Sequence, residues 1–128
     1  MITEMTLDAK RRFVKIIFSG QIDHKEILNA RSEIAELIKK NGIKNLLVDM
    51  RKVDLKLLTI DIYDFSTSER DFFPPGTKIA ALARGEESDF EKFKFMETVH
   101  YNSGFCFKIF LKMSDAIGWL GGSSAEGK

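Results

Sequence analysis

The stretch from Lys78 to Leu120 limits the fold of this chain more than any other part of it. An apolar segment at residues 79–83 is followed by a charged helical pattern, an Asn102-Ser103-Gly104 break and an aromatic segment at residues 105–110. A second helical pattern then closes the stretch. Strands that alternate with helices through short connections pair in parallel, and helices normally cover the faces of a parallel sheet. The stretch therefore predicts an α/β fold.

The first half of the chain shows the same alternation. A nearly continuous apolar run at Phe13–Phe18 predicts a strand that is buried on both faces and ends at Gly20. Asp23 and Glu26 form a capping-box pattern, which marks the start of a helix. Apolar residues then recur at helical spacing up to Gly42, a typical helix-ending residue.

The middle of the chain predicts one more strand and one more helix. Residues 45–49 form an apolar run that indicates a second buried strand, and residues 50–56 are expected to be a polar connection. A helix is predicted at residues 59–69. Two consecutive prolines make residues 72–76 irregular, because proline is excluded from helix interiors and central strands.

Length and composition indicate a soluble domain without an obvious nucleic-acid surface. The chain has 128 residues, 44% of them hydrophobic and 30% charged, which predicts one domain at residues 1–120. Residues 121–128 have linker composition and are expected to be disordered. A formal net charge of +1 argues against nucleic-acid binding. No signal-peptide pattern or membrane-length apolar run occurs, so the expected location is cytoplasmic.

No metal or cofactor is expected. Cys106 is the only cysteine, which excludes an intrachain disulfide and a cysteine-rich metal site. Its neighbours Phe105 and Phe107 predict a buried, structural role for it. The acidic and histidine residues show no recognisable metal-ligand spacing, and no predicted strand is followed by a glycine-rich dinucleotide pattern.

His100 is the most interesting titratable residue in the sequence. On a helix at residues 89–101 it shares an arc with Phe93 and Met96, which favours a hydrogen-bonded histidine in or near the core. The alternative is a functional histidine coupled to Glu97, which lies three positions earlier on the same helix. That alternative also needs a pocket and an orienting group.

Eleven phenylalanines are a high number for a chain of this length. Phe90, Phe93 and Phe95 cannot all lie on one narrow helix stripe, and Phe72 and Phe73 add apolar surface before the prolines. Surplus apolar surface is typical of a dimer contact, a partner site or a cavity for an apolar ligand. A thick hydrophobic core explains the same count equally well.

The order of these segments resembles the small bacterial STAS-like proteins, often described as SpoIIAA-like. STAS denotes the sulfate transporter and anti-sigma factor antagonist domain. The resemblance covers residues 12–120 and depends most on Leu46-Leu47-Val48-Asp49, the Glu97-to-Gly104 approach to the aromatic strand, and residues 115–120. It implies four or five mostly parallel strands, an antiparallel first hairpin strand and about four flanking helices. SEC14-like lipid-binding domains have a similar core architecture.

The chain departs from this family at its regulatory motif. Anti-sigma factor antagonists carry an Asp-Ser-Ser-Gly-like motif at the helix that follows the Leu-Val-Asp strand, and a kinase phosphorylates a serine there. The corresponding residues 57–60 are Leu-Leu-Thr-Ile, so Thr59 is the only hydroxyl at this place. A phosphorylation switch of the usual kind is therefore not expected.

Three functions remain open at this point. The favoured one is a non-enzymatic binding or regulatory module that acts through a homodimer or protein-partner surface formed by Asp54, Thr59, Tyr63, Phe72 and Phe73.

The second function is a carrier of a lipid or small apolar ligand. Its pocket would be lined by Phe65, Phe93, Phe95 and His100, with Phe72 beside them. The third and least favoured function is a small enzyme that uses His100 with Glu97.

Overall fold

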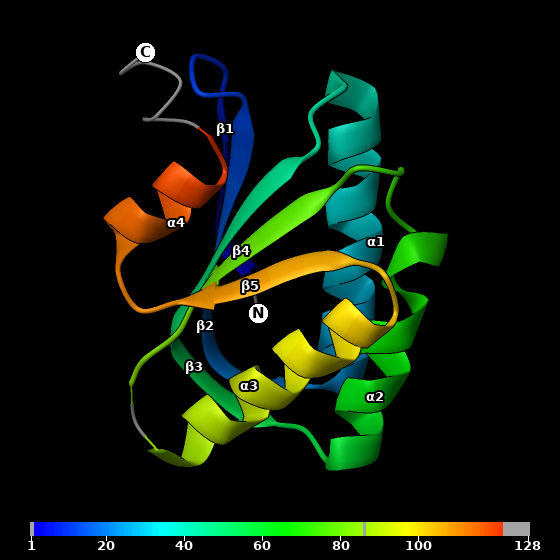
Figure 1. Ribbon diagram of the computed structural model, residues 1–128, viewed down its shortest axis with the longest axis vertical. Coiled ribbons are helices and arrows are strands. Elements are labelled where there is room, and N and C mark those ends of the chain that lie inside the picture. The colour runs from blue at the N-terminus through cyan, green and yellow to red at the C-terminus, as the bar shows by residue number, and fades with distance from the viewer. Residues whose placement is uncertain (1, 86, 122–128) are drawn as a thin grey trace.

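A five-stranded mixed sheet runs through the centre of the molecule (Figure 1). The computed structural model describes residues 2–85 and 87–121, so most of the predicted tail at residues 121–128 lies outside the described residues. The spatial order follows the chain: β1 (Ile2–Asp8), β2 (Phe13–Asp23), β3 (Asn45–Lys56), β4 (Lys78–Leu82) and β5 (Cys106–Phe110). β1 pairs antiparallel with β2, and the other three pairs are parallel. This arrangement confirms the predicted α/β sheet with its antiparallel first strand.

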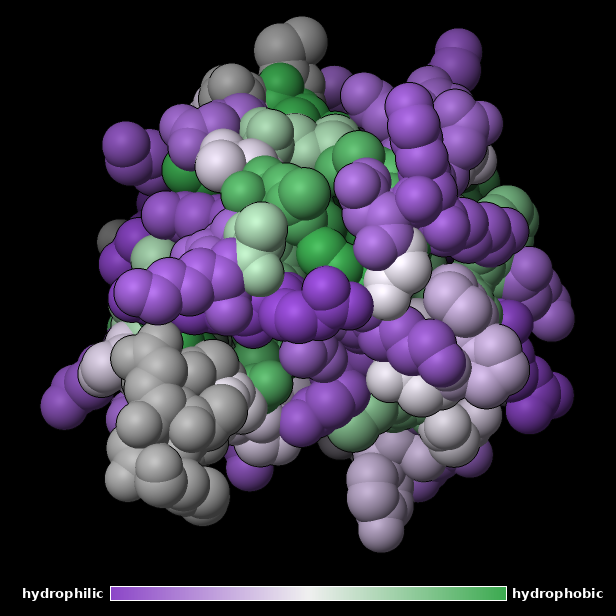
Figure 2. All heavy atoms as spheres, turned by 90° about the horizontal axis from the view of Figure 1, so that it is seen from above, coloured by the Kyte–Doolittle hydropathy of each residue, from purple (hydrophilic) through white to green (hydrophobic). Residues whose placement is uncertain are grey.

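Helices cover both faces of the sheet unequally (Figure 1). The larger cover consists of α1 (His24–Asn41), α2 (Thr59–Ser68) and α3 (Glu87–Asn102), and a short 3₁₀ turn, η1 (Glu69–Asp71), follows α2. The opposite face carries only the short α4 (Met113–Trp119). Two hydrophobic clusters result, a large one under the three helices and a small one under α4. Seen from above, hydrophilic side chains form most of the outline and hydrophobic residues gather in the middle (Figure 2).

The caps of α1 explain why this helix has its predicted bounds. The Asp23 carboxylate accepts a hydrogen bond from the Glu26 backbone N–H at 2.9 Å, and the Asp23 N–H donates to the Glu26 carboxylate at 3.1 Å. Gly42 ends the helix in the left-handed conformation with φ of 67°, which glycine adopts without a Cβ clash. The capping box and the glycine stop are both confirmed.

Two strands are longer than predicted. β2 continues through Gly20 to Asp23, and β3 continues through residues 50–56, which were expected to be a connection. The two extensions pair with each other, with Gly20 opposite Val53. Backbone hydrogen bonds between them stabilise segments whose sequences alone are weak strand signals.

Cys106 is exposed, so its predicted burial was wrong. β5 is an edge strand, and Cys106, Lys108 and Phe110 alternate onto the face that only α4 covers. α4 covers the Phe110 end of that face, where Trp119 lies 5.7 Å from the Phe110 ring, centroid to centroid.

Among the described residues, no helix combines the length and apolar composition that a membrane span requires.

Candidate functional site

Arg31 is the centre of a buried polar cluster between α1 and the end of α2. It lies on the buried face of α1 and is only 7% exposed. Its Nη1 donates to Glu69 Oε1 at 3.1 Å, to Ser68 Oγ at 2.9 Å and to the Phe65 carbonyl at 3.2 Å. The Phe72 ring covers one face of the guanidinium, with its centroid 3.8 Å from Arg31 Cζ. Hydrogen bonds and a cation–π contact therefore hold this charge in the interior.

His100 extends this cluster from α3. It is fully buried and stacks on the Phe107 ring at a centroid distance of 4.1 Å. Its Nδ1 lies 2.7 Å from the Met96 carbonyl, and its Nε2 lies 3.2 Å from Glu69 Oε2. We call Arg31, Glu69 and His100 the Arg31 network. The prediction of a hydrogen-bonded core histidine is confirmed.

Glu97 does not pair with His100. Its carboxylate instead accepts a hydrogen bond from the Ile109 backbone N–H at 2.9 Å, on the edge strand β5. Spacing on the helix placed the two residues near each other, but Glu97 turns to β5 while His100 turns inward to Glu69. His100 has no exposed surface and its two ring nitrogens face Met96 and Glu69, so it lacks the open cleft that the enzyme hypothesis requires. The described residues contain no group of three or more histidine, cysteine or acidic side chains placed to hold a metal ion.

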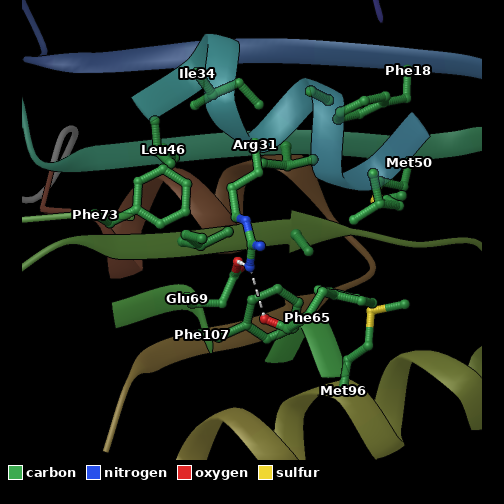
Figure 3. Close-up of a pocket in the computed structure, with 15 residues that line it drawn as sticks. Phe18, Arg31, Ile34, Leu46, Met50, Phe65, Glu69, Phe73, Met96 and Phe107 are labelled. Atoms are coloured by element: carbon green, nitrogen blue, oxygen red, sulfur yellow. Dashed lines mark hydrogen bonds and ion pairs between the residues drawn. The ribbon is translucent and has the colours of Figure 1, made fainter. Parts of the chain in front are cut away.

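A small pocket lies between α1 and the sheet, next to the Arg31 network (Figure 3). Its volume is about 70 Å³, and its walls are apolar except at Arg31 and Glu69. Ala30 on α1 and Ala81 on β4 line it, and their short side chains leave space that longer ones would fill. In Figure 3, Arg31 reaches from α1 toward Glu69 between the other lining side chains. The remaining lining residues are Phe18, Ile27, Ile34, Leu46, Val48, Met50, Phe65, Phe73, Ile79, Met96 and Phe107.

This pocket differs from the one that the carrier hypothesis needs. Phe65 lines it, but Phe93, Phe95 and His100 do not. Phe93 is a core residue, and Phe95 is partly buried against the core. Pockets for drug-sized ligands measure about 300–1,000 Å³. A volume of about 70 Å³ is too small for a lipid.

The first turn of α2 presents a cluster of exposed apolar side chains. Leu58 is 70% exposed, Ile60 66% and Tyr63 54%, and Thr59 between them is also exposed. Because residues 60 and 63 are one helical turn apart, their side chains are neighbours on the helix surface. We call Leu58, Thr59, Ile60 and Tyr63 the α2 surface.

Charged side chains border the α2 surface. Asp54 and Lys56, near the end of β3, form an ion pair at 3.2 Å with both side chains 54% exposed. Asp61 accepts a hydrogen bond from the Leu58 N–H at 2.9 Å. His24 contacts Asp64 at 3.0 Å, which ties the start of α1 to α2. A polar border around an apolar centre is typical of protein–protein interfaces.

The residues predicted for a partner surface fall into two groups. Asp54, Thr59 and Tyr63 are exposed near the start of α2. Phe72 lies beyond the other end of α2, on the guanidinium of Arg31. Phe73 is only 6% exposed and lies 6.0 Å from the Phe105 ring, centroid to centroid. Its placement on a surface was therefore wrong, because the η1 turn directs the chain inward at this position.

Asp49, a buried residue, forms an ion pair with the exposed Arg51 on the face of the sheet opposite the pocket. Arg51 donates to it twice, from Nε to Oδ1 at 3.0 Å and from Nη2 to Oδ2 at 2.8 Å. Burial raises the pKa of Asp49, but the hydrogen bonds and positive charge of Arg51 outweigh that effect and hold the pKa below its usual value. Both carboxylate oxygens are occupied, so Asp49 is a structural residue here.

Sequence reasoning missed four residues of these sites: Arg31, Glu69, Leu58 and Ile60. Arg31 interrupts the apolar stripe of α1, four positions after Ile27 and three before Ile34. A charged residue inside an apolar stripe was the signal that could have identified it. No sequence pattern indicates that Leu58 and Ile60 are exposed, because two apolar residues at the start of a helix are usually buried.

Comparisons with known proteins identify the fold. No family model matches the chain, and no curated protein matches its sequence. The solved structure of the anti-sigma factor antagonist SpoIIAA in its unphosphorylated form superposes with a TM-score of 0.59 at 13% identity, covering 95% of this chain and 99% of that chain. This protein has the SpoIIAA-like fold.

Two further structures agree with this SpoIIAA-like fold. An anti-sigma factor antagonist from Mycobacterium paratuberculosis has a TM-score of 0.60 at 15% identity, covering 94% of each chain. An uncharacterised protein with a SpoIIAA-like fold from Shewanella loihica PV-4 has a TM-score of 0.58 at 17% identity, covering 94% of this chain and 92% of that chain. The STAS-like resemblance read from the sequence is confirmed for the fold.

Proposed function

We propose that this protein is a non-enzymatic regulatory module that binds a protein partner through the α2 surface. The observation that carries the proposal is the exposure of Leu58, Ile60 and Tyr63 on one helical turn. Large apolar side chains exposed singly are common on soluble proteins, but neighbouring ones mark interaction sites. Two of the similar structures are anti-sigma factor antagonists, which supports a regulatory protein–protein role.

The chemistry of the α2 surface fits a protein partner better than a small ligand. Tyr63 offers a large aromatic ring with a polar hydroxyl, a combination enriched in interfaces. Leu58 and Ile60 are exposed at the start of α2, and neither of them lines the pocket beside Arg31. Asp54 and Lys56 beside them supply charges that can orient the partner.

Thr59 gives this surface a place for modification. SpoIIAA has been solved in phosphorylated and unphosphorylated forms. Thr59 is exposed at the first position of α2, where a phosphate would meet free backbone N–H groups, although Asp61 opposes it with a negative charge. The proposed binding does not depend on this modification.

The test places a photo-crosslinking amino acid at Ile60 in the cells that make the protein and identifies the partner that it captures. The partner is then purified, and its dissociation constant is measured by titration. We expect Ile60→Asp and Tyr63→Ala each to weaken binding about tenfold or more, as substitutions of central interface residues do. Leu111→Asp is the matched control, because Leu111 is 53% exposed on a different part of the molecule.

Each outcome decides between interpretations. Loss of binding in the two α2 variants but not in Leu111→Asp supports the proposal. Unchanged binding in Ile60→Asp, or equal weakening by the control, contradicts it. A wild-type dimer in light scattering that Ile60→Asp converts to a monomer would assign the α2 surface to self-association instead.

A further inference from the structure

We propose that the pocket beside Arg31 binds a small organic acid. The carboxylate of the acid accepts a hydrogen bond from the Arg31 Nε–H, and its methyl end lies against the apolar wall. The inference is independent of the α2 surface, which lies outside this pocket. It begins from one atom: Arg31 Nε is buried and has no hydrogen-bond acceptor among the described residues.

The geometry of Arg31 leaves this donor for a ligand. Nη1 already donates to Glu69, Ser68 and the Phe65 carbonyl, and the Phe72 ring covers one face of the guanidinium. Arg31 is 7% exposed and lines the pocket, so bulk water does not satisfy the remaining N–H. Buried donors without acceptors are rare in folded proteins, and each requires an explanation such as a bound molecule.

The charge of Arg31 favours an anion. The Glu69 carboxylate lies 3.1 Å from Arg31 Nη1 and also contacts His100 through Oε2, so it is shared between two partners and does not reach Arg31 Nε. A ligand carboxylate at Nε would make a charge-assisted hydrogen bond, which is stronger than a bond to a neutral acceptor.

The size and lining of the pocket define the ligand further. An apolar cavity of about 150 Å³ holds benzene, which has six non-hydrogen atoms, so about 70 Å³ corresponds to roughly three or four, the size of acetate. Several water molecules would also fit, but buried water needs two to four polar partners each. Only Arg31 and Glu69 supply polar side chains here, while Met50, Met96 and their neighbours are apolar. An amphipathic acid matches this lining better than water does.

The test uses protein with ¹³C-labelled methionine methyl groups, titrated with sodium acetate and followed by NMR. Met50 and Met96 line the pocket, and Met113, the first residue of α4, packs on the opposite face of the sheet. We expect saturable shifts at Met50 and Met96 and none at Met113. Acetamide, which is similar in shape but uncharged, should bind at least tenfold more weakly.

Two variants separate this binding from a nonspecific effect. Arg31→Lys keeps the positive charge but removes the Nε–H, and it should weaken acetate binding at least tenfold. Ala81→Val fills space in the pocket from β4, keeps all three residues of the Arg31 network and should abolish binding. If Arg31→Lys does not fold, the ligand affinity of Ala81→Val decides the test by itself. Absence of saturation, equal binding of acetamide, or unchanged affinity in Ala81→Val would overturn the proposal and leave a pocket that holds water only.

Discussion

Glu69→Gln is the substitution that tests the Arg31 network most directly. Glutamine keeps the shape, can accept from Arg31 and can donate to His100 Nε2, so the variant removes little besides the negative charge. At the 3.1 Å separation of Arg31 Nη1 and Glu69 Oε1, the attraction is about 5 kcal/mol for an effective dielectric constant of about 20. The variant leaves a buried, unpaired guanidinium. We expect the free energy of unfolding to fall by about 3–5 kcal/mol.

Urea unfolding, followed by Trp119 fluorescence and by circular dichroism, measures this change. With an m-value of about 2 kcal/mol per molar urea, the midpoint should fall by about 2 M. Asp54→Asn is the matched control, because its ion pair with Lys56 has a similar distance of 3.2 Å but both side chains are 54% exposed. The control should lose less than about 1 kcal/mol.

A double-mutant cycle completes this prediction. Arg31→Met removes the charge that Glu69→Gln leaves unpaired, so the double variant should lose about 1–3 kcal/mol less than the sum of the single variants. A loss below about 1 kcal/mol in Glu69→Gln, or additive losses in the cycle, would refute the assignment of a coupled, charged network.

Three further predictions follow from packing and electrostatics. Ala81→Val should raise the free energy of unfolding by about 1–2 kcal/mol, at about 24 cal/mol per Å³ of the roughly 70 Å³ filled; a decrease in urea unfolding would indicate overpacking. Arg51→Met should raise the pKa of Asp49, measured by carboxyl ¹³C NMR. In the wild type, the stability from that lowered pKa is present above about pH 3.9 and is lost as pH falls further, and the variant should lack this step. Trp119→Ala should lose about 2–3 kcal/mol, because Trp119 is only partly buried against Phe110; unchanged thermal stability would contradict the packing of α4 on the sheet.

The parts of the fold that were predictable depend on local interactions. α1 was predictable because Asp23, Glu26 and Gly42 interact with backbone only a few residues away. The order of strands and helices was predictable from hydrophobic periodicity, which the solved SpoIIAA-like structures support. The ends of β2 and β3 were not, because each segment becomes a strand only by pairing with the other.

The candidate sites were predictable only in part, for a related reason. Thr59 and Tyr63 were selected by their place after the second parallel strand, and both are exposed there. Phe73 was selected for its apolar character, which cannot distinguish an exposed residue from a core residue. Its burial depends on the η1 turn and on the Phe105 ring.

The sequence by itself determined the α/β class, the caps of α1 and the order of strands and helices along the chain, because these depend on interactions and periodicities within short segments. Only the tertiary structure brought Arg31, Glu69 and His100 together, from three elements far apart in the chain. It also decided that His100 faces Glu69 instead of Glu97, and that Leu58 and Ile60 remain exposed. Contacts of this kind depend on how helices and strands pack against each other, which local sequence does not encode.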